Sequence, residues 1–211
     1  MRLVVLANEQ LKEELLSIGV SDYCKIDWIN SPKELLSHED ADAVIDLLFE
    51  NNGYDVSHLN NYLTKPVFVN SMNKTIVEIG LPFIRINAWL GFLKRSIAEV
   101  SIADEVNKNK AEKILSLLNR KAEWVPDVKG FISPRIISMI INEAYFTLEE
   151  NVSTKEEIDI AMKLGTNYPY GPFEWSKKIG LKNIADLLTE LFITEKRYQP
   201  ASLLLKEASE Q

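Results

Sequence analysis

The stretch Gly130-Phe131-Ile132-Ser133-Pro134-Arg135 decides the fold of the last third of the chain, because it opens a long apolar helix. A second helix ends at Ala161-Met162-Lys163-Leu164-Gly165, and the turn-forming run Tyr168-Pro169-Tyr170-Gly171-Pro172-Phe173-Glu174 follows it. Every segment from Ser133 onward has the pattern of a helix. We therefore predict a helical domain over residues 129–211, which follows a domain that ends at residue 128.

Local signals place the ends of two helices in this domain. Ser153 and Glu156 have the spacing of a capping box ahead of the apolar run at residues 158–164. Gly165 is a natural C-terminal stop for that helix. A further helix is predicted over residues 181–194. These signals give the domain at least three helices joined by short turns.

Toward the N-terminus, short apolar runs alternate with helical patterns. Helices are expected at residues 11–18 and 105–118, with a short helical segment after Ser31-Pro32. Near-continuous apolar runs separated by helices indicate a parallel sheet covered on both faces, the doubly wound arrangement that often binds nucleotides. The strands are expected at residues 3–6, 25–29, 43–49, 66–69, 83–86 and 96–102.

The composition limits the classes of function. The chain has 211 residues, 46% of them apolar, and a formal net charge of −7. Lys and Arg form no clustered run, so we expect small molecules or proteins as partners, with no nucleic acid and no membrane. Cys24 is the single cysteine, which excludes an internal disulfide. Because residues 1–7 are too short and strand-like for a signal peptide, and no apolar run could span a bilayer, a cytoplasmic location is expected.

Three motifs together resemble the 3-hydroxyacyl-CoA dehydrogenase family. The runs at residues 130–135 and 168–174 look like its C-terminal domain, and Ala41-Asp42-Ala43-Val44-Ile45-Asp46 is similar to the family's Ala-Asp-Leu-Val-Ile-Glu. The resemblance implies an α/β plus all-α fold: a reduced Rossmann-like, NAD-binding-type domain at residues 1–128, then a helical 6-phosphogluconate-dehydrogenase-C-terminal-like domain. It further implies NAD-dependent oxidation of 3-hydroxyacyl-CoA in fatty-acid metabolism and a homodimer formed through the helical domain.

The cofactor loop departs from the family's pattern. A dinucleotide fold normally has G-x-G-x-x-G after its first strand, because glycines let the backbone approach the pyrophosphate. This chain has Leu6-Ala7-Asn8-Glu9-Gln10-Leu11-Lys12, with no glycine, and we expect Asn8 to cap the helix. The stretch at residues 30–42 is also shorter than the family's, so part of the acyl-CoA site is missing. The resemblance leaves Asp46, Glu50 and Asn70 as candidate cofactor-binding residues.

The catalytic stretch departs more strongly. The family's His-Phe-Phe-Asn-Pro and Leu-Val-Glu-Val fall on Asn87-Ala88-Trp89-Leu90-Gly91 and Ile97-Ala98-Glu99-Val100. Oxidising a 3-hydroxy group requires a base, and the amide of Asn87 cannot act as one. Glu99 matches the acidic partner of the family's histidine and is the candidate catalytic residue. The family's substrate-binding serine corresponds to Met72, which leaves Ser71 and Asn73 as substitutes.

Each candidate also has a structural interpretation. Asp46, Glu50 and Glu99 can be solvated carboxylates at strand ends or on a strand edge, and Ser71 and Asn73 can be surface polar residues of a loop. The two histidines, His38 and His58, lie outside the motif and are expected at the surface, with no metal site.

Three hypotheses about function follow. The first is a degenerate homologue, retained for ligand binding or assembly, for which no cofactor is firmly expected. The second is an active dehydrogenase that uses NAD and a rearranged site containing Glu99, Asp46 or Glu50. The third is an interaction subunit of a fatty-acid enzyme. An acyl-CoA-like small molecule is a possible ligand.

Overall fold

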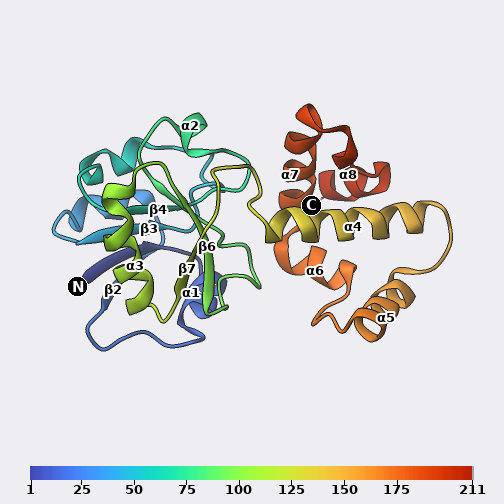
Figure 1. Ribbon diagram of the computed structural model, residues 1–211, viewed down its shortest axis with the longest axis horizontal. Coiled ribbons are helices and arrows are strands. Elements are labelled where there is room, and N and C mark those ends of the chain that lie inside the picture. Colours follow the sequence, from blue (N-terminus) through green and yellow to red (C-terminus); the bar gives the residue numbers. More distant parts are fainter. Residues whose placement is uncertain (211) are drawn as a thin grey trace. The chain divides into compact units, whose positions relative to one another are not determined.

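The chain consists of two compact units, and each is described by itself. The computed structural model describes residues 1–210, and the units are Met1–Phe131 and Ile132–Gln211 (Figure 1). The division follows Phe131, whereas the sequence placed it after Val128. The first unit contains the sheet and the second is built from helices.

The first unit contains one seven-stranded sheet in the order β2-β1-β3-β4-β5-β6-β7. All neighbouring strands are parallel except β5 and β6, which are antiparallel, so the parallel arrangement predicted from the first four strands is confirmed. The connection between β5 and β6 is too short for the crossover of about a dozen residues that parallel neighbours need. The strands are β1 (Arg2–Leu6), β2 (Lys25–Ile29), β3 (Ala43–Asp46), β4 (Val67–Asn70), β5 (Ile84–Ile86), β6 (Ile97–Ile102) and β7 (Lys121–Trp124).

The sequence predicted six of these strands and missed one. β7 was missed because its residues alternate between exposed and half-buried and lack a continuous apolar run. β3 was predicted to continue to residue 49, but it ends at Asp46, whose side chain accepts the N–H of Leu48 at 2.9 Å and turns the chain.

The two faces of the sheet are covered differently. The helices α1 (Glu9–Leu16) and α3 (Lys108–Leu117) pack on one face, where Ala111, Ile114 and Leu115 of α3 are buried. The opposite face is covered by the 3₁₀ segments η1 (Pro32–Ser37) and η2 (Ser57–Tyr62), because Leu35, Leu59 and Tyr62 pack against it. The short helix α2 (Ile76–Ile79) and the 3₁₀ turn η3 (Glu105–Asn107) complete this unit.

The strand order reverses between β1 and β3. From β1 the chain passes to β2 on one side, and β3 then lies on the other side of β1. Leu6 is the register partner of Asp46, so the last residues of β1 and β3 lie side by side. Open α/β sheets bind their ligands outside the carboxyl ends of the strands at this kind of reversal. We call this end of the sheet, with the loops that follow β1, β3, β4 and β5, the carboxyl edge.

The second unit is entirely helical in its described residues, as predicted, and α7 has the predicted bounds. Two local predictions were one or two residues off. The capping box is formed by Thr154 and Glu157, and α5 passes through Gly165 to end at Thr166, followed by the C-cap Asn167 with a left-handed φ of 55°. The helices are α4 (Ser133–Glu149), α5 (Lys155–Thr166), α6 (Pro172–Ile179), α7 (Leu181–Thr194) and α8 (Ser202–Ser209), with the 3₁₀ turn η4 (Lys196–Tyr198) between the last two.

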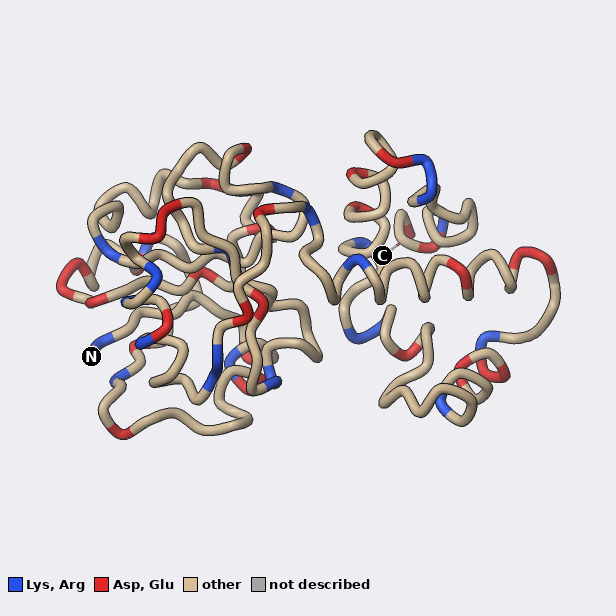
Figure 2. Tube along the Cα trace, viewed as in Figure 1, with Lys and Arg blue, Asp and Glu red and all other residues tan. Residues whose placement is uncertain are grey.

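Charges are dispersed over both units. Figure 2 shows Lys and Arg interspersed with Asp and Glu along the trace, and the chain carries a net charge of −7. Within residues 1–210, no helix is both long enough and apolar enough to cross a bilayer.

A close approach between two segments fixes the start of α6. The carboxylate of Asp159 on α5 accepts the N–H groups of Phe173 and Glu174 at 2.8 and 3.2 Å, which caps the first turn of α6. A Cβ atom at Gly171 would lie 2.3 Å from Oδ1 of Asp159 and 2.5 Å from its Cα. The sequence therefore requires glycine here for space, since φ at Gly171 is an ordinary −72°.

We predict that Gly171→Ala lowers the free energy of unfolding by about 1–3 kcal/mol, because the new methyl group overlaps the backbone of Asp159. Gly165→Ala is the matched control, since Gly165 lies inside α5 with nothing within 4 Å of its Cβ position. The control should raise stability by about 0.5–1 kcal/mol. Urea unfolding followed by circular dichroism measures both, and equal effects of the two substitutions would contradict the account.

Candidate functional site

The carboxyl edge brings most of the predicted site residues together. Asp46 and Asn70 are the last residues of β3 and β4, and Asn87 directly follows β5. Glu99 lies on β6 opposite Asn87, whose N–H donates to the Glu99 carbonyl at 3.0 Å. The remaining candidates, Glu50, Ser71 and Asn73, lie in the loops that follow β3 and β4.

The amide of Asn87 has partners within the protein at both of its polar atoms. Its Nδ2 donates to Oε2 of Glu99 at 3.1 Å, and its Oδ1 accepts the N–H of Trp89 at 3.2 Å. Asn70 is arranged similarly, since its Oδ1 accepts the N–H of Ala88 at 3.1 Å. Both asparagines are buried. Glu99 is not on a sheet edge, because β7 pairs with β6 on its far side, so that part of the structural interpretation was wrong.

Asp46 pairs with a histidine that sequence reasoning set aside. The Asp46 side chain is fully buried, not solvated, and its Oδ2 lies 2.9 Å from Nε2 of His58, whose side chain is only 7% exposed. Burial raises the pKa of Asp46, and the hydrogen bond from His58 partly offsets that rise. The expectation of a surface His58 was wrong because η2 packs it against the end of β3. No local pattern links two residues so far apart in the chain.

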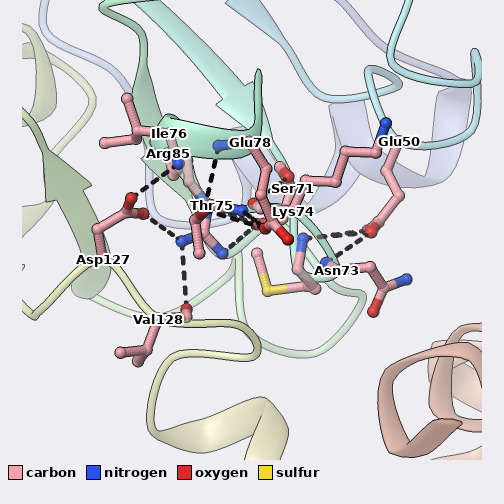
Figure 3. Close-up of polar contacts among 11 residues, drawn as sticks. Glu50, Ser71, Asn73, Lys74, Thr75, Ile76, Glu78, Arg85, Asp127 and Val128 are labelled. Carbon is pink, nitrogen blue, oxygen red and sulfur yellow. Dashed lines mark hydrogen bonds and ion pairs between the residues drawn. The ribbon is translucent and has the colours of Figure 1, made fainter. Parts of the chain in front are cut away.

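Glu50 caps the loop that follows β4. Its carboxylate accepts the N–H of Asn73 at 2.9 Å and that of Met72 at 3.3 Å (Figure 3). It also accepts a hydrogen bond from the hydroxyl of Tyr54. Burial raises the pKa of Glu50, so a freely solvated carboxylate is the wrong description. Ser71 is also fully buried, against the surface-loop interpretation, because its hydroxyl donates to the carbonyl of Lys74 at 2.8 Å.

Arg85 was missed by sequence reasoning because it lies within an apolar strand. Its side chain is fully buried, and its guanidinium donates to the Ser71 carbonyl at 2.9 and 2.7 Å and to Asp127 at 2.5 Å (Figure 3). The guanidinium also stacks on the ring of Phe131 at 4.4 Å. Arg85 therefore fixes the loop after β4 to residues 127–131. An arginine in an apolar strand pattern is the one signal that could have identified it.

The turn between β1 and α1 does not fit a dinucleotide pyrophosphate in the usual manner. Oδ1 of Asn8 accepts the N–H of Leu11 at 2.9 Å, which confirms the predicted cap. The first turn of α1 carries the exposed carboxylate of Glu9, which disfavours an anion there. The turn has no glycine, the residue that would let the protein backbone approach a pyrophosphate closely.

At the carboxyl edge, side-chain oxygens of the chain accept hydrogen bonds from backbone N–H groups. In nucleotide-binding folds, backbone N–H groups of this kind bind phosphate. The pairs are Asn8 with Leu11, Asp46 with Leu48, Glu50 with Met72 and Asn73, Asn70 with Ala88, Asn87 with Trp89, and Glu14 of α1 with Gly91.

We predict that the free energy of unfolding of Glu50→Gln rises relative to that of the unchanged protein as the pH rises from about 4 to 7. The folded-state pKa of Glu50 is raised, so its contribution to stability is fully present below its unfolded pKa and is lost as the pH rises through the folded pKa. Glutamine cannot ionise and escapes that loss. Urea midpoints at several pH values measure the difference, with Glu123→Gln at an exposed position on β7 as the control. A relative stability that falls with pH would contradict the raised pKa.

Comparison with known proteins identifies the family. Residues 130–210 match the family model of the 3-hydroxyacyl-CoA dehydrogenase C-terminal domain. The chain is 32% identical over 170 residues to 3-hydroxyadipyl-CoA dehydrogenase of Escherichia coli K12, an alignment that covers 80% of this chain and 36% of that protein. It is 28% identical over 206 residues to 3-hydroxybutyryl-CoA dehydrogenase of Clostridioides difficile, covering 85% of this chain and 73% of that protein.

The fold agrees with this match. The structure of (S)-3-hydroxybutyryl-CoA dehydrogenase from Ralstonia eutropha superposes with a TM-score of 0.75 at 20% identity, covering 99% of this chain and 93% of that one. The chain spans about a third of the length of the first curated relatives it matches. A sheet unit followed by a helical unit is thus an arrangement shared with these enzymes. Residues 130–210 are therefore a C-terminal domain of the 3-hydroxyacyl-CoA dehydrogenase family.

Proposed function

We propose that this chain is a degenerate homologue of the 3-hydroxyacyl-CoA dehydrogenases, retained for ligand binding or assembly and not for oxidation of a hydroxyacyl-CoA. One observation carries the proposal. Asn87, which falls on the position of the family's catalytic histidine, has both polar atoms of its amide hydrogen-bonded within the protein, to Glu99 and to Trp89.

The chemistry of the amide supports this proposal. Removal of a hydroxyl proton as hydride leaves requires a group that accepts the proton near neutral pH. The amide of Asn87 has no such capacity, and its oxygen is already occupied by a backbone N–H. Glu99 accepts a hydrogen bond from Asn87, so the acidic partner orients an amide where the family orients an imidazole.

The hydrogen bonds at the carboxyl edge also support the proposal, because they oppose binding of the cofactor. NAD binding in the family's manner needs backbone N–H groups that are open to the pyrophosphate. Here Asn8 caps α1, and Glu50 occupies the two N–H groups of the loop after β4. A diphosphate would have to displace these acceptors and tolerate the nearby Glu9.

A rearranged active site is the second candidate, and the pair formed by Asp46 and His58 is the observation that favours it. A buried carboxylate that orients an imidazole is the arrangement used for proton transfer in many enzymes. The pair lies at the reversal of strand order, apart from the position of Asn87. On this candidate, turnover would depend on His58 and would not need Asn87.

We predict that Asn87→His alone produces no oxidation of NADH with acetoacetyl-CoA. The Asn8 cap on α1 and the Glu50 carboxylate, which accepts the N–H groups of the loop after β4, would still oppose binding of the cofactor. The unchanged protein should also be inactive, and the 3-hydroxybutyryl-CoA dehydrogenase of Clostridioides difficile serves as the positive control of the assay. Appreciable turnover by Asn87→His would contradict the proposal. Turnover by the unchanged protein that is lost in His58→Gln would instead establish the second candidate.

A further inference from the structure

Strand β2 forms one edge of the sheet, and one side of its backbone is unpaired. In the order β2-β1-β3-β4-β5-β6-β7, β2 has β1 as its single neighbour, and within residues 1–210 no strand lies on its other side. An edge strand presents a row of open N–H and C=O groups, which can pair with a further strand. The free side of β2 is therefore a candidate surface for association.

Alternation along β2 identifies the residues whose backbone groups face its free side. The N–H of Lys25 and the carbonyl of Ile29 are hydrogen-bonded to the residues that flank β1, at 2.9 and 3.2 Å. Lys25 and Ile29 therefore point their backbone groups towards β1. Because successive residues of a strand point these groups to opposite sides, Ile26 and Trp28 point theirs to the free side.

The side chains of β2 differ between the two faces of the sheet. Ile26 and Trp28 are half-buried and pack against the apolar cluster beneath α1 and α3. Lys25 and Asp27 lie on the opposite face. The Lys25 side chain is 73% exposed, and its Nζ lies 3.7 Å from Oδ1 of Asp27, which also pairs with Arg2. The strand thus carries a cation and an anion on either side of Ile26.

A second copy of the chain matches this pattern. In an antiparallel pair with a two-fold axis at Ile26, each Ile26 exchanges both backbone hydrogen bonds with Ile26 of the other copy. Lys25 of each copy then lies directly opposite Asp27 of the other, with Cβ atoms about 4.5–5.5 Å apart. The N–H of Trp28 faces the carbonyl of Cys24 in the other copy. Charges on an edge strand usually oppose pairing, but here each charge meets its opposite.

Other pairings match less well. An axis at Asp27 would place the two Asp27 carboxylates opposite one another, and like charges directly opposite destabilise a pair. The other edge strand, β7, has a similar alternation, with Lys121 and Glu123 on either side of Ala122. Its central residue is alanine, which buries little apolar area across the axis. β7 therefore provides matched controls for β2.

We propose that β2 is an interface through which two copies of the chain associate, by antiparallel pairing about Ile26 with Lys25 of each copy against Asp27 of the other. The pairing extends the sheet across both copies and uses the free side of both β2 strands, so association through this strand stops at a dimer. This inference goes beyond the proposed function and is independent of it, because the pairing involves neither the cofactor loop nor Asn87.

A disulfide across the two-fold axis tests the pairing directly. In the whole chain with Cys24→Ser, Ile26→Cys should form a disulfide-linked dimer when glutathione disulfide is added. Opposite residues of a hydrogen-bonded pair have Cα atoms about 5.5 Å apart, which lies within the range of disulfides. Ala122→Cys in the same background is the control at the other edge and should run as a monomer on a non-reducing gel. No link through residue 26, or equal linking of both variants, would overturn the inference.

A charge reversal tests the register without a new covalent bond. Lys25→Glu places a carboxylate opposite Asp27 in both contacts and should raise the dissociation constant of the dimer about tenfold, as measured by sedimentation equilibrium. Lys121→Glu on β7 changes the net charge equally and should leave that constant unchanged. A dimer that persists undiminished in Lys25→Glu would assign association to another surface and overturn the inference. An unchanged protein that stays monomeric up to the millimolar range would overturn it as well.

Discussion

The requirement that buried polar groups find partners governs the carboxyl edge of the sheet. Parallel strands that end together leave several N–H groups pointing past the edge, and nucleotide-binding proteins satisfy such groups with phosphate oxygens. This chain satisfies them with its own side chains, chiefly Asn8, Glu50 and Asn70. The carboxylate of Glu50 thus stands where an anionic ligand would otherwise be expected. The proposals on function follow from this single difference.

The acidic side chains at the edge need support because burial disfavours their charge. Asp46 has His58 as its partner, and Glu50 has two backbone N–H groups and the hydroxyl of Tyr54. Arg85 completes the arrangement, since it holds the carbonyl of Ser71 and so fixes the loop that Glu50 caps. Loss of one partner would leave a charge buried without compensation, so these contacts stabilise the loops only as a set.

The sequence was sufficient for features that depend on local pattern. Apolar periodicity predicted the bounds of α7 and the positions of six strands, and the family's motifs predicted the helical unit. The capping box was misplaced by one residue because serine and threonine are adjacent at 153 and 154, as are two glutamates at 156 and 157, so two registers fit the motif equally. The antiparallel pairing of β5 and β6 depended on the length of a connection that the pattern analysis did not weigh.

Features that depend on distant residues were not predictable from one sequence. The pairing of Asp46 with His58 requires η2 to fold back onto β3, and no spacing rule encodes that return. The role of Arg85 likewise depends on residues 127–131, far along the chain. The resemblance to the family aligned the candidate positions and also gave Glu99 as the partner of the position of Asn87. The partners of Asp46 and Glu50 came only from the structure.

The central claim is that the carboxyl edge is closed to a dinucleotide by the chain's own acceptors. A calorimetric titration of the unchanged protein with NADH tests it most directly. The account predicts no saturable heat at any concentration up to the millimolar range. Saturable binding with a micromolar dissociation constant would contradict it, because the dinucleotide would then displace the caps supplied by Asn8 and Glu50.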